Sequence, residues 1–152
     1  MKTSEFSDIW ILAEQHNGKL LRISYELLTQ GMALAQKKSC KLCAIVFSSG
    51  IENDELEKLI ACGADKVISV ENSQLEHFLP EPYSACMSGL IEKYKPEVIL
   101  AGATSTGRTL MPYTAMRACA GLTADCTQLD IESGAGNLLQ TRLLRARFGL
   151  DL

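Results

Sequence analysis

One segment of the sequence has the residue types and the spacing of a phosphate-binding turn. Gly102-x-x-x-x-Gly107-Arg108-Thr109 differs from the phosphate-loop pattern G-x-x-x-x-G-K-[ST] only at Arg108. An apolar run precedes it and a helical pattern follows, so its backbone N–H groups would point toward an anion from the start of a helix. Hydroxyl side chains would add further donors. The candidate site is therefore made of Gly102, Thr104, Ser105, Thr106, Gly107, Arg108 and Thr109.

Three features argue against a nucleoside triphosphatase. Arg108 stands where a lysine is needed, and its planar guanidinium does not replace a compact ammonium between two phosphates. The motif follows the fourth expected strand rather than the first, and no other strand ends in a convincing metal-binding aspartate. Two interpretations stay open. The segment is either a tight turn in which a Ser or Thr caps the next helix, or a weak anion or adenosine-phosphate site without hydrolysis.

The other reactive residue types form no catalytic set. His16 follows the first apolar run and could contact a ligand, but a lone loop histidine is more often merely solvated. Cys40-x-x-Cys43 is the only close cysteine pair, and nothing else in the sequence completes a zinc site around it. Six cysteines in 152 residues fit free thiols better than a disulfide scaffold. We therefore expect no enzymatic activity of its own and no metal.

The elements that would position these residues alternate between strand and helix. Apolar runs at 9–13, 42–47, 67–70 and 98–101 predict four strands, and a helical pattern follows each of them. Four such units require a parallel sheet with right-handed crossovers. We expect an α/β fold, a Rossmann-like three-layer sandwich with a mainly parallel sheet (adenine-nucleotide alpha-hydrolase-like). Ligands bind beyond the C-terminal ends of such strands, which selects the loops 14–18, 48–50 and 102–109.

Prolines and the last thirty residues interrupt this regular pattern. Residues 72–82 are polar and contain two prolines, which predicts a loop before a helix at 83–94. Pro112 is expected early in the last helix, where a missing N–H costs least. Residues 123–131 and 138–142 predict two short strands around the turn 133–136, as in a β hairpin near the C-terminus.

Length, composition and charge exclude several classes of protein. A chain of 152 residues with 47% hydrophobic and 22% charged residues is typical of one globular domain. A net charge of −3 argues against a nucleic-acid or membrane surface. No apolar run approaches the ~18 residues of a membrane span, and the first residues do not look like a signal peptide. We expect a cytoplasmic protein with no nucleic-acid partner and no membrane insertion.

Residues 96–112 (PEVILAGATSTGRTLMP) and 120–127 (AGLTADCT) closely resemble the alpha subunit of electron transfer flavoproteins. The segments 8–14 (DIWILAE), 63–67 (GADKV) and 138–142 (LLQTR) are also similar to that family, so the resemblance covers residues 8–142. After Arg142 the family's motif PAFGGN does not follow. We expect residues 1–142 to form an alpha-subunit N-terminal domain and 143–152 a divergent tail. The FAD-binding C-terminal domain is expected to be absent, as in a truncated chain.

The resemblance implies a role in electron transport. In this family the alpha subunit forms a heterodimer with a beta subunit and carries one FAD. The complex moves electrons from flavin dehydrogenases, such as the acyl-CoA dehydrogenases of fatty acid β-oxidation, to a quinone oxidoreductase and the respiratory chain. The alpha N-terminal domain mainly docks the beta subunit, so this chain alone is not expected to bind FAD. The alternative is a stand-alone adenine-nucleotide- or phosphate-binding α/β module that uses Gly102–Thr109.

Overall fold

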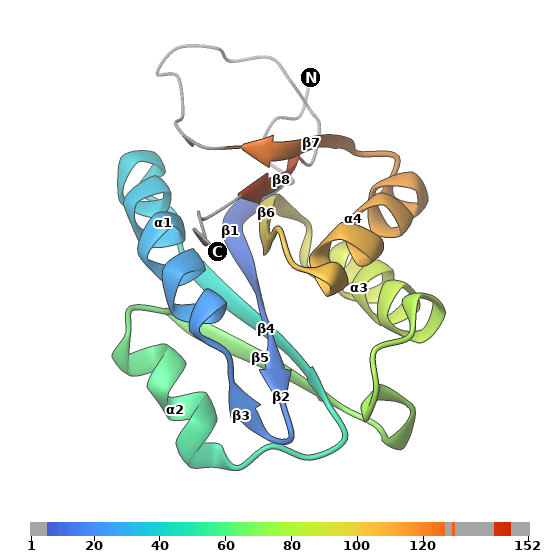
Figure 1. Ribbon diagram of the computed structural model, residues 1–152. Helices are drawn as coiled ribbons and strands as arrows, with labels where there is room; N and C mark the ends of the chain where they lie inside the picture. The colour runs from blue at the N-terminus through green and yellow to red at the C-terminus, as the bar shows by residue number, and fades with distance from the viewer. Residues whose placement is uncertain (1–5, 127–128, 130–141, 147–152) are drawn as a thin grey trace.

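Six parallel strands form the central sheet of the computed structural model, which describes residues 6–126, 129 and 142–146. The order across the sheet is β5-β4-β1-β6-β8-β7. These strands are β1 (Ser7–Ala13), β4 (Leu42–Ser48), β5 (Lys66–Glu71), β6 (Pro96–Gly102), β7 (Gly121–Cys126) and β8 (Arg142–Ala146). Helices α1 (Arg22–Lys38) and α2 (Asn53–Ala61) cover one face, and α3 (Pro80–Tyr94) and α4 (Ser105–Ala118) cover the other (Figure 1). The Rossmann-like three-layer sandwich predicted from the sequence is confirmed.

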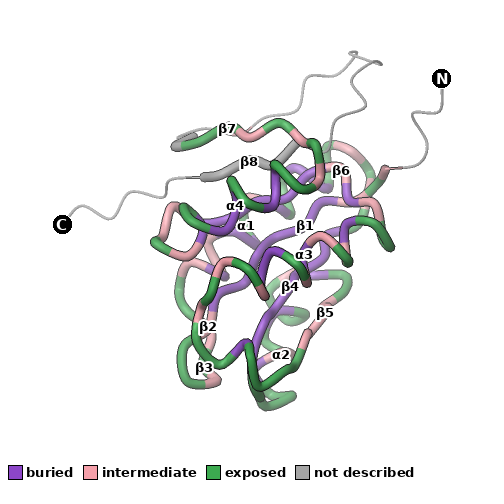
Figure 2. The backbone as a smooth tube through the Cα atoms, turned by 90° about the vertical axis from the view of Figure 1, so that its right-hand side faces the viewer, coloured by how far each residue is buried: buried purple, intermediate pink, exposed green. Residues whose placement is uncertain are grey.

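The continuous apolar runs of the central strands follow from burial on both faces. Alternate residues of β1 enter different cores: Ile9 and Ile11 pack on the side of α1 and α2, whereas Trp10 and Leu12 pack on the side of α3 and α4. All four are at most 2% exposed, and β4 is buried along its whole length. Figure 2 shows this concentration of buried residues along the inner strands. Each fully buried aliphatic side chain stabilises the fold by about 1.5–3 kcal/mol.

The strand order reverses at β1, and this places the site. From β1 the chain proceeds to β4 and β5 on one side, then crosses back to β6 on the other side of β1. The connections that leave β1 and β6 therefore diverge at the carboxyl ends of these two strands. In open α/β sheets such a switch point is the usual place for a ligand.

Two expectations about proline-containing segments are wrong. The loop predicted for 72–82 contains the short 3-10 helix η1 (Ser73–Leu75), and α3 already begins at Pro80. A proline is well placed there because the first N–H groups of a helix have no partner within it. Pro112, which was expected early in α4, lies in the middle of that helix. It is exposed, so the interruption of the helical hydrogen-bond ladder falls on the solvent side.

The prediction of a β hairpin near the C-terminus is also wrong. Two strands are present, but β7 and β8 pair in parallel, and β8 lies between β6 and β7. A parallel pair needs a long crossover and cannot form around a tight turn. The expected turn at 133–136 lies outside the described residues, and β8 takes residues 143–146 of the expected tail into the sheet.

Directly after β1, the short strands β2 (Gln15–His16) and β3 (Lys19–Leu20) pair in an antiparallel hairpin. Its two turn residues, Asn17 and Gly18, have positive φ angles of 50° and 75°. This is the conformation that a two-residue hairpin of type I′ requires, and Asn-Gly is its preferred sequence.

Candidate functional site

The two glycines of the predicted phosphate loop are required by packing. A Cβ atom on Gly107 would lie 2.0 Å from the carbonyl oxygen of Gly102. A Cβ atom on Gly102 would lie 2.6 Å from Cγ1 of Ile23 in α1. The turn between β6 and α4 is therefore folded tightly against itself and against the first turn of α1, and no bound anion is needed to explain either glycine.

Thr104 connects this turn to the end of β1. Its Oγ1 caps α4 by accepting a hydrogen bond from the N–H of Gly107 at 3.1 Å. The same hydroxyl donates to Oε1 of Glu14 at 2.6 Å. One side chain thus joins the carboxyl ends of the two strands that flank the switch point.

Glu14 is the buried carboxyl group of the site. It directly follows the apolar run of β1 and is 8% exposed. Its backbone is fixed by Ser24, whose Oγ accepts from the Glu14 N–H and donates to the Glu14 carbonyl, both at 2.9 Å. Burial raises the pKa of the Glu14 carboxyl group, and the hydrogen bond from Thr104 partly opposes this change.

This carboxyl group changes the interpretation of the phosphate loop. The N-terminus of α4 already faces an acid of the chain itself, through the hydroxyl of Thr104. A phosphate placed there would meet Glu14, and like charges repel at close range. The geometry therefore favours a capped structural turn over an anion site.

The other predicted loop residues lie around this cap. Thr109 donates from its hydroxyl to the carbonyl of Ser105 at 2.9 Å, and the N–H of Arg108 donates to the carbonyl of Thr104 at 2.8 Å. The side chains of Ser105, Arg108 and Thr109 are exposed. Of the seven predicted residues, Thr106 lines the cleft described next.

A cleft of about 340 Å³ opens beside the carboxyl ends of β1 and β4. Residues of the predicted loop 14–18 form one wall, and the segment 76–78 before α3, which the sequence did not suggest, forms another. The predicted loop 48–50 contributes nothing, although Phe47 just before it does. The lining residues are Leu12, Ala13, Glu14, Gln15, His16, Asn17, Leu21, Phe47, Glu76, His77, Phe78, Tyr83 and Thr106.

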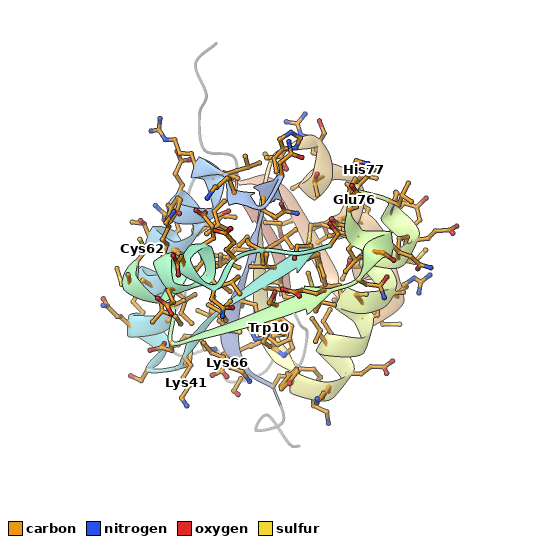
Figure 3. The ribbon with its side chains drawn as sticks, turned by 90° about the horizontal axis from the view of Figure 1, so that it is seen from below. Trp10, Lys41, Cys62, Lys66, Glu76 and His77 are labelled. Carbon is orange, nitrogen blue, oxygen red and sulfur yellow. The ribbon has the colours of Figure 1, made fainter. Side chains whose placement is uncertain are left out.

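His16 belongs to the exposed rim of this cleft, in β2. His77 is also exposed and lies on the opposite wall. In Figure 3, Glu76 and His77 lie at the end of β4 and β5 that is opposite to Lys41 and Lys66. The cleft thus shares the sheet edge at which ligands of this fold class bind.

The hairpin that carries His16 is held by two further side chains. Gln15 donates from Nε2 to the carbonyl of Phe47 at 3.2 Å and accepts from the N–H of Gly18 at 3.0 Å. Glu55 of α2 accepts from the N–H of Leu20 at 3.1 Å and from the ammonium groups of Lys19 and Lys58. These donors, that of Lys58 first, lower the pKa of Glu55 to about 2.

Burial makes both thiols of the cysteine pair considered from the sequence harder to deprotonate. Burial raises the pKa of Cys43 to about 12 and also raises that of Cys40. A thiol is a poor nucleophile and a poor metal ligand until it loses its proton.

Within the described ranges, His, Cys, Asp and Glu side chains form no group of three or more that could hold a metal ion. Among the same residues, no helix combines the length and apolar character needed to cross a membrane.

Comparison with known proteins gives one consistent family. The sequence profile of the family "Electron transfer flavoprotein domain" matches residues 9–149. The electron transfer flavoprotein subunit alpha of Thermoanaerobacterium thermosaccharolyticum is 47% identical over 139 residues, covering 91% of this chain and 42% of that protein. The acryloyl-CoA reductase electron transfer subunit beta of Anaerotignum propionicum is 42% identical over 130 residues, covering 85% of this chain and 35% of that protein.

The name of a third relative contains a lactate dehydrogenase in place of the acryloyl-CoA reductase. The lactate dehydrogenase (NAD(+),ferredoxin) subunit LctC of Acetobacterium woodii is 34% identical over 139 residues, covering 91% of this chain and 33% of that protein. The chain therefore spans between a third and about two fifths of the length of these relatives.

Proposed function

Since this chain belongs to the electron transfer flavoprotein domain family, we propose that it serves as the N-terminal part of an alpha-type electron-transfer subunit. Its main task is to dock a beta-type subunit of the same family, and it contributes no catalytic group of its own. The observation that carries the proposal is the continuous family match over residues 9–149, supported by 47% identity to a subunit named alpha.

The complex would work between a dehydrogenase and a membrane quinone oxidoreductase, in the cytoplasm. The names of two relatives attach this family to an acryloyl-CoA reductase and to a lactate dehydrogenase. The first of these names supports a redox partner that acts on acyl-CoA substrates, as in fatty acid β-oxidation. Because the second name contains a different enzyme, we propose that the redox partner is chosen by the rest of the assembly.

The residues at the switch point do not fit FAD. The pyrophosphate of a dinucleotide requires free N–H groups at a helix N-terminus or a glycine-rich nest. Here that place at the start of α4 is taken by the Thr104 hydroxyl and the Glu14 carboxyl group. We propose that the flavin is held elsewhere in the assembly, and no electron-transfer step is assigned to residues of this chain.

The stand-alone nucleotide-binding module remains the competing proposal. It predicts saturable binding of AMP that depends on Arg108, since a guanidinium next to a phosphate adds a charge-assisted hydrogen bond worth about 1.5–3 kcal/mol. If Arg108→Ala weakens AMP binding to the chain, the module is supported. Absence of AMP binding leaves the docking domain as the better proposal.

Sedimentation of the chain with a beta-type subunit from the same organism tests the docking proposal. The expected result is one species whose mass is the sum of one copy of each chain. The matched control mixes the chain with a soluble α/β protein of similar size and net charge. Independent sedimentation of both chains at concentrations well above the micromolar range would contradict docking.

A further inference from the structure

Three buried side-chain oxygens have no hydrogen-bond partner among the described residues: the hydroxyls of Ser48, Ser69 and Ser88. Ser48 is the last residue of β4 and is fully buried. It belongs to the loop 48–50 that the sequence selected as a candidate ligand loop, although it does not line the cleft. Burying a hydroxyl without a partner is unfavourable, so each of these oxygens requires an explanation.

Ser48 and Ser69 lie on the same face of the sheet. Val46 and Ser69 are register partners in the parallel pair of β4 and β5, so their side chains point to the same side. Val46 belongs to the core on the side of α1 and α2, and Ser48, two residues further along β4, points to that side as well. Phe47 points to the opposite side, which is why it lines the cleft and Ser48 does not.

The spacing of the two serines fits a bridge made by one water molecule. Ser48 is paired with Glu71 and Ser69 with Val46, so the serines are diagonal neighbours, one strand and two residues apart. Strands about 4.8 Å apart, with a rise of about 3.3 Å per residue, place such positions about 8 Å apart. No hydrogen bond joins the two hydroxyls directly. When both Cβ–Oγ bonds lean inward, a water with two hydrogen bonds of about 2.8 Å spans the remaining gap.

The chemistry of this place favours water over an ion. The buried side chains of the surrounding core are aliphatic, among them Val46 of β4 and Leu59 of α2. Two neutral hydroxyls cannot offset the cost of burying a charge. A water molecule can donate to one hydroxyl and accept from the other, and internal waters typically bridge buried polar groups that have no other partner.

We propose that one internal water molecule bridges Oγ of Ser48 and Oγ of Ser69, between the sheet and the helices α1 and α2. This water ties the carboxyl end of β4 to the edge strand β5. Ser88 lies on α3, which covers the other face, so it cannot share this water. The proposal is independent of docking to a beta-type subunit, because both serines and the gap between them lie within this chain.

Oxygen-17 relaxation dispersion of the full chain tests the proposal, because it counts long-lived internal waters through the water oxygen itself. The double variant Ser48→Ala with Ser69→Ala should lose one such water relative to the wild type. Ser84→Ala is the matched control: Ser84 is equally buried, but its hydroxyl already donates to the carbonyl of Glu81 at 3.1 Å. This control should keep the wild-type count. An unchanged count in a double variant whose amide spectrum shows the native fold would overturn the proposal.

A double-mutant cycle in urea gives a second, independent readout. Each single variant, Ser48→Ala or Ser69→Ala, removes one of the two bonds of the water and leaves the other hydroxyl poorly paired, so each should lower the unfolding midpoint. The double variant leaves no hydroxyl to satisfy, so its shift should be smaller than the sum of the single shifts. Single shifts that add, whichever their sign, would show that the two hydroxyls share no partner and would overturn the bridge.

Discussion

Replacing Gly107 by alanine tests the packing of the β6–α4 turn directly. The new Cβ would lie 2.0 Å from the carbonyl oxygen of Gly102, well inside the 3.0 Å below which real Cβ contacts essentially do not occur. The obstructing atom belongs to the backbone, so no side chain can rotate away. Overpacking of this kind costs about 3 kcal/mol or more, and the better helix propensity of alanine returns about 1 kcal/mol. We expect a net loss of at least about 2 kcal/mol in the free energy of unfolding.

Gly89→Ala is the matched control. Gly89 also lies in a helix, α3, but a Cβ there would meet nothing within 4 Å. This variant should gain about 0.5–1 kcal/mol from helix propensity alone. Urea unfolding followed by circular dichroism separates the two, since a slope of about 1–3 kcal/mol per molar places the Gly107→Ala midpoint roughly 1 M lower. A Gly107→Ala midpoint equal to that of the wild type would refute the close approach of the two glycines.

Three further predictions concern titratable groups. Because burial raises the pKa of Glu14, ionisation of this carboxyl group opposes folding as the pH rises through the folded-state pKa. In urea titrations, Glu14→Gln should therefore be more stable than the wild type at pH 7. This gain in stability should vanish below pH 4.5. The pKa of Glu55 is lowered from 4.5 to about 2, so its contribution to the stability of the fold is complete above pH 4.5 and is lost as the pH falls toward 2. Glu55→Gln should therefore be less stable than the wild type at pH 7, and its free energy of unfolding should fall less on acidification. Brief alkylation of the native protein, followed by mass spectrometry, should label the exposed Cys62 and Cys119 and spare the buried Cys43, whose pKa is about 12; early labelling of Cys43 would contradict its burial.

The central fold could be predicted because its signals are local. The runs 9–13 and 42–47 are apolar at every position. This pattern is typical of a strand that is covered on both faces of the sheet. The C-terminal part failed for the opposite reason. Turn residues at 133–136 suggested a hairpin, but pairing between β7 and β8 is decided by their contacts with each other and with β6, which no local pattern records.

The place of the Gly102–Thr109 segment in the fold could be predicted from the sequence, but its contacts could not. The Gly102–Thr109 segment does lie at the switch point, as the strand–turn–helix context indicated. Its hydroxyl at Thr104 faces Glu14, ninety residues earlier, and only the folded sheet brings them together. The one available signal was that Glu14 is the first polar residue after a buried strand. The wall at 76–78 gave no such signal, because it lies in a segment that was expected to be an ordinary polar loop.

The visible absorption spectrum tests the central proposal most directly. The chain is purified alone after incubation with excess FAD, and in parallel as a complex with its beta-type partner, and both spectra are recorded after gel filtration. A docking domain without a flavin site predicts a colourless chain and a complex whose mass is the sum of both subunits, whatever the colour of the complex. A yellow chain that retains FAD stoichiometrically in the absence of the partner would contradict the proposal that the flavin is held elsewhere in the assembly.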